Sequence, residues 1–277
     1  MTIYDSVLDK AVAAGNERAA EGETYTQDGL LYCAKCGQPR QRKGSTENDF
    51  ERGKMFPVMC KCQEQEKERE QQAENRKAAK ALRAECLPKA LRKCTFENAD
   101  TSSKAASIAQ RYVEHWQEMA AENHGIIFWG NVGSGKSFLA ICIANALIDQ
   151  GIKVKYITAT ALINGLSGSS ANRGALMSEI ENAPLLIIDD LGAEYANGYT
   201  ESTLCEAIEA RKNSGKPLIV TTNYTIAEMD NAKDGAQERM FDRIKEICSP
   251  VAVLGASRRQ SNAKEANKRF AELLGIN

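Results

Sequence analysis

The stretch FWGNVGSGKS, from Phe128 to Ser137, decides how most of this chain folds. Two apolar residues lead into a glycine-rich turn that ends in a lysine and a hydroxyl, and the turn fits the pattern G-x-x-x-x-G-K-[ST]. Glycines let the backbone wrap around phosphate oxygens with successive N–H groups pointing inward, and a helix N-terminus adds the positive end of its dipole. The pattern follows a predicted strand and opens a predicted helix, so we predict a nucleotide-binding loop.

The ligands expected in this loop are ATP and Mg²⁺. Lys136 is expected to reach the β- and γ-phosphates, and Ser137 to hold the magnesium ion. A chance match to the whole pattern in this context is the weaker explanation. We assign the nucleotide contacts to the loop and to one carboxylate further along the chain: Gly130, Asn131, Val132, Gly133, Ser134, Gly135, Lys136, Ser137 and Asp189.

From Gly125 onward, apolar runs of strand length alternate with helical patterns, which is typical of a parallel sheet. The predicted strands are IIFW (126–129), KVKYI (153–157), LLIID (185–189), PLIVT (217–221) and VAVL (251–254). The predicted helices lie near 137–149, 174–182, 201–213 and 236–247. We therefore expect an α/β domain with one parallel five-stranded sheet flanked by helices.

Polar residues at the ends of two of these strands are expected to complete the nucleotide site. Asp189 and Asp190 follow four apolar residues; Asp189 would join Ser137 at the magnesium ion, and Asp190 would orient the attacking water. Many ATPases carry glutamate at this second position. Asn223, after LIVTT, would sense the γ-phosphate through that water. The alternatives are acidic caps at a strand exit and a turn-forming asparagine.

Two pairs of arginines follow: Arg239 and Arg243 in ERMFDRIKE, and Arg258 and Arg259 in ASRRQ. An arginine that reaches the γ-phosphate of a neighbouring copy stabilises the charge of the transition state. Arginines in surface salt bridges would have the same pattern, and this alternative stays open for each of them.

Together these motifs resemble the AAA+ superfamily, in the DnaC/DnaI clade of bacterial and phage replicative-helicase loaders, with IstB-type transposition helper ATPases as close relatives. The resemblance is carried by GNVGSGKS, IIDDLGAE, EARKNSGKPLIVTTNY, ERMFDRI and LGASRR, which span Ile126 to Arg259. It implies a sheet of order 5-1-4-3-2 and a reduced lid, because 23 residues follow Leu254.

The resemblance also assigns roles to individual residues. Lys136 and Ser137 match the Walker A motif, Asp189 and Asp190 match Walker B, and Asn223 matches sensor 1. Arg243 resembles the arginine finger that acts on the neighbouring subunit, with Arg239 as the alternative. Arg259 resembles the sensor 2 arginine, with Arg258 as the alternative.

Four of the nine cysteines form two close pairs, Cys33 with Cys36 and Cys60 with Cys62. Four thiolates in two pairs suit tetrahedral Zn²⁺, which can stabilise a segment too small for a core of its own. Four unrelated reduced cysteines are the alternative. The remaining cysteines lie singly in helical patterns and are expected to act as small apolar residues: Cys86, Cys94, Cys142, Cys205 and Cys248.

The expected organisation has three parts: an N-terminal helix and zinc module (1–62), a charged helical linker (63–98) and an ATPase domain (99–277). The net charge of −1 indicates no global attraction to nucleic acid, so a DNA contact needs a local patch such as RQRKGS (40–45) or Lys153 and Lys155. The first residues lack a signal-peptide pattern, and with many cysteines this indicates a reducing, cytoplasmic location.

The leading hypothesis is an ATP-switched protein of DNA replication that loads a DnaB-type hexameric helicase onto single-stranded DNA. In the DnaI-type layout the zinc module grips the helicase, while the ATPase domain self-associates through its ATP site and touches the single strand. An IstB-like transposition helper that assembles on DNA is the alternative. A third possibility is an adaptor that binds nucleotide without hydrolysing it.

Overall fold

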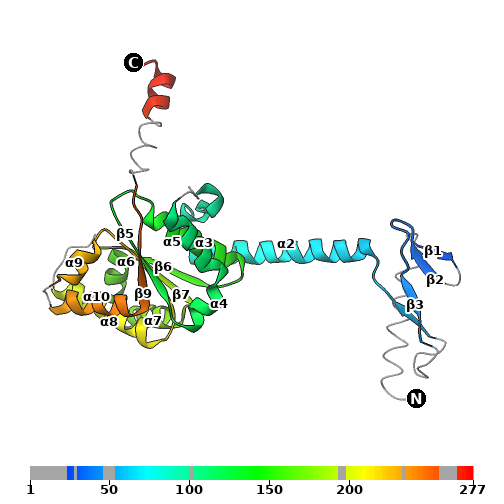
Figure 1. Cartoon of the computed structure of the whole chain (residues 1–277), viewed down its shortest axis with the longest axis horizontal. Helices are drawn as coiled ribbons and strands as arrows, with labels where there is room; N and C mark the ends of the chain where they lie inside the picture. Colours follow the sequence, from blue (N-terminus) through cyan, green and yellow to red (C-terminus); the bar gives the residue numbers. More distant parts are fainter. Residues whose placement is uncertain are drawn as a thin grey trace. The chain divides into compact units, whose positions relative to one another are not determined.

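The computed structural model describes residues 30–45, 54–99, 103–192, 198–232, 235–255 and 267–276, and the backbone of 24–27. The chain forms two units, Met1–Lys77 and Ala78–Asn277, which are taken one at a time below. Their boundary lies within helix α2 (Lys61–Cys86), inside the linker predicted for 63–98 (Figure 1). The helix predicted at the N-terminus lies outside the described residues.

The first unit contains two short antiparallel hairpins. Strand β1 (Thr24–Gln27) pairs with β2 (Leu30–Cys33), and β3 (Gln41–Lys43) pairs with β4 (Met55–Pro57). Across the second hairpin the Arg42 guanidinium lies 4.6 Å from the centre of the Phe56 ring. The only apolar side chains that are buried among this unit's described residues are Cys33 and Cys60.

Helix α2 changes character along its length. No residue of α2 itself is buried, in keeping with the charged run QEQEKEREQQAENRK. Towards its end, however, Leu82 and Cys86 pack against the core of the second unit, and Leu87 is 2% exposed. Leu82 and Cys86 are four residues apart and share one face of the helix. The last part of the predicted linker, with the 3-10 turns η1 (Leu91–Lys93) and η2 (Phe96–Asn98), therefore belongs to the second unit.

The second unit is built on a parallel five-stranded sheet of order β6-β7-β8-β5-β9. Counted from β5 along the chain this order is 2-3-4-1-5, so the predicted order 5-1-4-3-2 is confirmed. The strands are β5 (Gly125–Trp129), β6 (Val154–Thr158), β7 (Leu185–Leu191), β8 (Leu218–Thr222) and β9 (Cys248–Ala252). The last strand was predicted at 251–254, but β9 begins three residues earlier, where Cys248 pairs with Gly125, and it ends at Ala252. Only the first half of the predicted range is therefore strand. Pro250 is compatible with this strand, which lies at an edge of the sheet.

Helices cover both faces of this sheet (Figure 1). One face carries α3 (Lys104–Glu114), α4 (Trp116–Ala121) and α5 (Lys136–Asp149). The other carries α6 (Ala159–Leu166), α7 (Ser170–Asn182), α8 (Gly198–Asn213) and α10 (Gly235–Ile247), with the short α9 (Ile226–Asp230) beside α10. In β7, Leu185 and Ile187 face α5, and Leu186 and Ile188 face the opposite layer.

Near the C-terminus, residues 267–274 form a helix. Of the helices in the described ranges, none is both long enough and apolar enough to cross a membrane.

Candidate functional site

The glycine-rich loop joins β5 to α5 and closely approaches a neighbouring backbone. Gly130 has φ +143°, and a Cβ atom built there would lie 2.4 Å from the carbonyl oxygen of Val253. Gly135, with φ +107°, caps the N-terminus of α5. Ser134 is buried, and its hydroxyl has no hydrogen-bond partner within the described part of the chain. The close approach at Gly130 and the unpaired hydroxyl fit a cradle for phosphate oxygens.

Lys136 connects this loop to the end of another strand. Its Nζ donates to the carbonyl oxygens of Gly130 (2.8 Å) and Asn131 (2.9 Å) and to Oδ1 of Asn223 (2.8 Å). Lys136 is only 6% exposed. Asn223 follows β8, which lies between β5 and β7, so the strand order brings the predicted sensor residue to the predicted phosphate lysine. Phosphate oxygens would compete with the loop carbonyls for the same ammonium group.

The Asp189 carboxylate is held from both sides. Tyr156 on β6 donates its hydroxyl to Oδ2 (2.8 Å), and Thr221 on β8 donates to Oδ1 (2.5 Å). Asp189 is buried, with 7% exposure. Burial, followed by the nearby Asp189 charge, raises the pKa of Tyr156 well above its ordinary value, so the phenol remains a donor.

Asp190 lies in a β-bulge at the end of β7. Ile188 pairs with Val220 and Leu191 with Thr222, so Asp189 and Asp190 together face Thr221. Asp190 has φ +62°, its N–H donates to the Thr221 hydroxyl (2.9 Å), and its side chain is exposed. The bulge thus turns the two adjacent carboxylates apart, one buried and one open to solvent.

The sequence interpretation did not single out Tyr156 or Thr221. The signal that identifies them is the alternation of side chains along neighbouring strands. On β6 and β8, Val154 and Ile219 face α5, and each lies two residues before one of these polar side chains. Tyr156, Asp189 and Thr221 therefore meet on the face of the sheet that carries the phosphate-loop helix.

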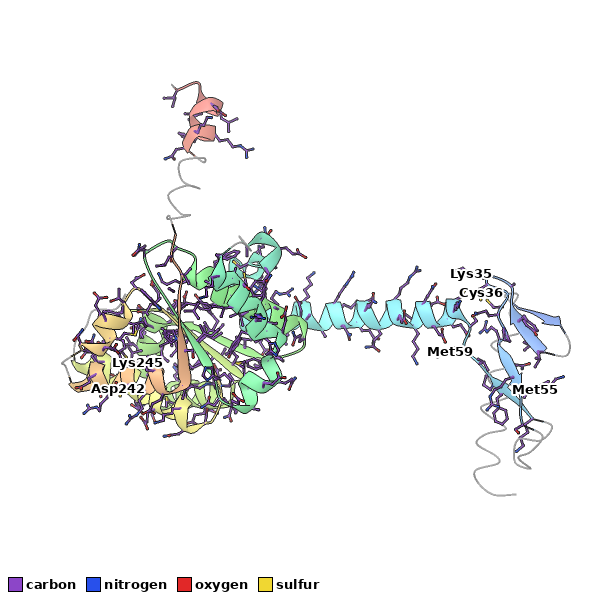
Figure 2. The ribbon with its side chains drawn as sticks, in the orientation of Figure 1. Lys35, Cys36, Met55, Met59, Asp242 and Lys245 are labelled. Atoms are coloured by element: carbon purple, nitrogen blue, oxygen red, sulfur yellow. The ribbon has the colours of Figure 1, made fainter. Side chains whose placement is uncertain are left out.

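The structure places the predicted arginines in different surroundings. Arg243 on α10 forms an ion pair with Glu209 on α8 and lies 3.7 Å from Glu246. Arg239, one turn earlier, is exposed and forms no ion pair with any described residue. Arg258 and Arg259 lie outside the described residues. Other charged side chains of α10 also form ion pairs, such as Lys245 with Asp242 at 3.3 Å (Figure 2).

In the first unit the four predicted cysteines converge. The sulfur atoms of Cys33, Cys36, Cys60 and Cys62 all lie within 4.8 Å of one another. Figure 2 shows Cys36 close to the start of α2. In a tetrahedral zinc site with Zn–S bonds of about 2.3 Å, sulfur atoms are about 3.8 Å apart, so the donor set and spacing fit zinc.

The backbone supports both cysteine pairs. Gly37, at φ +69°, donates its N–H to the Cys33 carbonyl (2.8 Å) and tightens the first turn. Gln38 bridges the pairs, because its side chain accepts from the Lys61 N–H (2.9 Å). The backbone N–H of Gln38, followed by hydrogen bonds with Cys62 and Cys33, lowers the pKa of Cys36 to about 7. Burial raises the pKa of Cys60, and the hydrogen bond with Cys36 raises that of Cys62.

Comparison with known proteins extends these observations. The sequence pattern of the family described as IstB-like ATP binding protein matches residues 61–266, which is more than half of the chain. The replicative helicase loader DnaC of Escherichia coli K12 is 29% identical over 160 residues, covering 55% of this chain and 63% of DnaC. The loader DnaI of Bacillus subtilis is 21% identical over 180 residues, covering 60% of this chain and 58% of DnaI. The match thus spans less than two thirds of these relatives.

Solved structures support the fold. A crystal structure of DnaI superimposes with a TM-score of 0.53 at 21% identity, covering 62% of this chain and 94% of that one. The DnaC helicase loader superimposes with a TM-score of 0.51 at 21% identity, covering 60% of this chain and all of that one. The expected likeness to this group is therefore confirmed in both sequence and fold.

Proposed function

Because the chain belongs to the IstB-like ATP binding protein family, we propose that it is an ATP-dependent loader that places a replicative hexameric helicase on single-stranded DNA. The similar proteins in Escherichia coli and Bacillus subtilis carry the name replicative helicase loader. The observation that carries the nucleotide part is the placement of Lys136 between the phosphate loop and Asn223.

In this proposal each residue of the nucleotide site has a defined task. The loop N–H groups from 131 to 137 hold phosphate oxygens, and Lys136 exchanges its loop carbonyls for the β- and γ-phosphates. Magnesium, when bound, neutralises charge on those phosphates. Ser137 would supply one oxygen to the ion, and Asp189 would accept a hydrogen bond from one of its waters.

Hydrolysis is assigned to the two residues that face outward at the strand ends. Asp190 accepts a hydrogen bond from the attacking water and so orients it. The Asn223 amide contacts the same water or the γ-phosphate, and its hydrogen bond to Lys136 ties it to the loop. An arginine of the neighbouring copy, Arg243 or Arg239, stabilises the transition state, and Arg259 contacts the nucleotide from its own chain. The site is therefore completed by self-association.

The cysteine module is assigned to helicase binding, with zinc as its metal. By the resemblance to DnaI-type loaders, residues 1–62 grip the helicase and 99–277 bind ATP and DNA. The linker expected at 63–98 is then confined to its first part, because its last part packs on the second unit. The four converging sulfurs favour a loader over an IstB-type transposition helper, since those helpers lack a cysteine module of this kind. The chain's own partners are then the helicase, single-stranded DNA and further copies of itself.

Co-purification tests the helicase assignment. The full chain is tagged in its native cell, and bound proteins are identified by mass spectrometry. We expect a replicative helicase to be retained, to be lost with Cys33→Ser, and to be kept with Cys205→Ser, which removes a thiol outside the cluster. Retention of the helicase by Cys33→Ser would exclude the module as the grip.

The resemblance to IstB-type proteins, with the match to the IstB-like ATP binding protein family, leaves one second candidate, a helper ATPase that assembles on duplex DNA during transposition. The two functions differ in their DNA and in their protein partner. Hydrolysis stimulated by single strands, together with a helicase complex, supports the loader. ATP-dependent filaments on duplex DNA without any helicase complex would support the helper.

A further inference from the structure

The strand register brings three polar side chains together at the proposed magnesium site. Tyr156, Asp189 and Thr221 come from β6, β7 and β8, which are neighbours in the sheet. The backbone of Thr158 pairs with Asp189, so Tyr156 lies two residues earlier on the same face, within reach of a long side chain. The two hydroxyls approach opposite oxygens of one carboxylate, at 2.8 and 2.5 Å.

We propose that Tyr156 is a positioning residue for magnesium-dependent ATP binding, which acts by fixing the orientation of the Asp189 carboxylate. The proposal rests on the proposed ATP function of the site. An aspartate side chain can rotate about its last bond, and one donor on each oxygen stops this rotation. Each carboxylate oxygen has two acceptor positions, so both oxygens keep one for a metal-bound water.

Packing alone does not explain the hydroxyl of Tyr156. The ring packs against the core beside α5, and a phenylalanine ring would fill the same space. Without the hydroxyl, however, Oδ2 of the buried Asp189 would lose the donor that faces it from β6. Only the Thr221 hydroxyl would then hold the carboxylate, from one side. The Thr221 hydroxyl also accepts a hydrogen bond from the Asp190 N–H.

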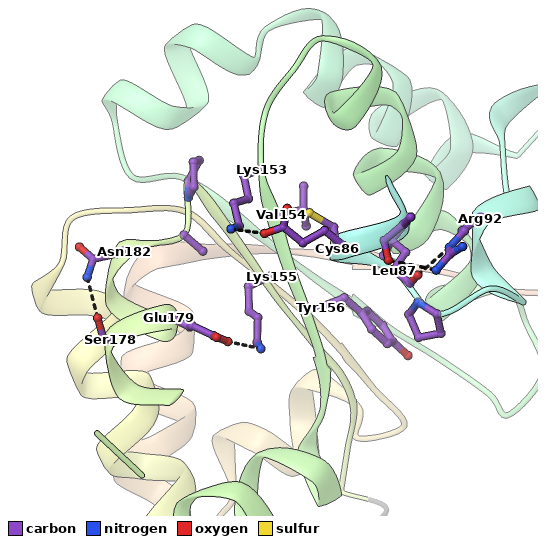
Figure 3. Close-up of a pocket in the computed structure, with 15 residues that line it drawn as sticks. Cys86, Leu87, Arg92, Lys153, Val154, Lys155, Tyr156, Ser178, Glu179 and Asn182 are labelled. Atoms are coloured by element: carbon purple, nitrogen blue, oxygen red, sulfur yellow. Dashed lines mark hydrogen bonds and ion pairs between the residues drawn. The ribbon is translucent and has the colours of Figure 1, made fainter. Parts of the chain in front are cut away.

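Tyr156 also lines a groove beside the edge strand β6. The groove has a volume of about 670 Å³ and lies between β6, the end of α2 and the last turns of α7 (Figure 3). Its two lysines are paired with glutamates, Lys153 with Glu85 and Lys155 with Glu179. The third cation of the lining, Arg92, donates to the backbone carbonyls of Leu87 and Ala84. The hydroxyl of Tyr156 instead donates to Asp189, which does not line the groove.

The test compares Tyr156→Phe with Tyr112→Phe. Tyr112 is a matched control, because its hydroxyl also makes a hydrogen bond, to the His124 carbonyl at 2.9 Å, and its ring belongs to the same core cluster. A fluorescent ATP analogue is titrated against each full-length variant with EDTA and with Mg²⁺. In EDTA we expect Tyr156→Phe to bind the analogue as tightly as the parent chain does. In the parent, Mg²⁺ should increase the affinity for the analogue, and in Tyr156→Phe this increase should be about tenfold smaller. Tyr112→Phe is expected to keep the full gain.

A second pair of variants tests the other half of the clamp. Thr221→Val is expected to reduce the Mg²⁺-dependent gain, and Thr221→Ser, which keeps the hydroxyl, to restore it. If the parent chain binds the analogue but Tyr156→Phe keeps the whole gain, the positioning role is wrong while the ATP function stands. If the parent binds no analogue at all, the proposed function fails and this inference fails with it.

Discussion

Removing one sulfur from the cysteine cluster, by Cys60→Ser, is expected to unfold the N-terminal module and to release its metal. Among the described residues of this unit, Cys33 and Cys60 are the only buried apolar side chains. Burial of two such small side chains supplies about 2 kcal/mol. A structural zinc ion supplies about 10–16 kcal/mol at neutral pH. If zinc is bound as proposed, the metal is expected to contribute more to the stability of the described part of the module than its buried apolar side chains do.

The assay has two readouts, metal content and protection from protease. The parent chain is expected to carry one zinc per chain and to resist cleavage between the two cysteine pairs. Cys60→Ser, or treatment with a strong chelator, is expected to remove both properties. The control Cys205→Ser changes a half-buried thiol on α8 and should alter neither.

The reasoning is refuted by either of two results. One is a parent chain that carries no metal yet remains protected in this region. The other is a Cys60→Ser chain with unchanged metal content and cleavage pattern. In either case the four sulfurs converge for a reason other than metal binding.

Three further predictions concern the second unit. Gly130→Ala places a Cβ atom against the carbonyl oxygen of Val253, at a backbone φ of +143° that alanine rarely adopts. The variant should bind a fluorescent ATP analogue at least about tenfold more weakly, and unchanged affinity would contradict the role of the loop. Arg211 is fully buried and donates five hydrogen bonds to backbone carbonyls. Arg211→Met should therefore lower the free energy of unfolding, measured in urea, by about 3 kcal/mol, and a loss under about 1 kcal/mol would argue against this structural role. Arg243→Ala should keep nucleotide binding and stop ATP hydrolysis, and mixing it with Asp190→Asn should restore activity. If Arg239→Ala and not Arg243→Ala gives this result, Arg239 is the arginine finger.

The sheet and its phosphate loop could be predicted from the sequence because buried parallel strands are continuous apolar runs. Each run is followed by glycine or polar residues that mark its end, as at Gly130 and Asp189. Helix α6 was not predicted, because it follows β6 directly, with Thr158 serving both as the last strand residue and as the helix cap. The short polar strand β3 carries no apolar pattern, and the hairpin that contains it was also not predicted.

Contacts between distant segments were beyond the sequence interpretation. The hydrogen bond from Tyr156 to Asp189 joins residues 33 positions apart and depends on the register of two strands. The ion pairs of Lys153 with Glu85 and of Lys155 with Glu179 likewise join residues 68 and 24 positions apart, and a DNA contact of these lysines stays a prediction. The roles of the arginines remain predictions, because Arg243 or Arg239 would act on a neighbouring copy, and Arg258 and Arg259 lie outside the described residues.

The left-handed backbone of Asp190 limits which side chains can serve at that position. Aspartate, asparagine and glycine tolerate such a conformation, whereas a longer acid adds strain. Replacing Asp190 with glutamate, the residue that many ATPases carry there, should therefore perturb the bulge and give no faster enzyme. Asparagine keeps the backbone and removes only the charge, which makes it the cleaner probe of the chemical step.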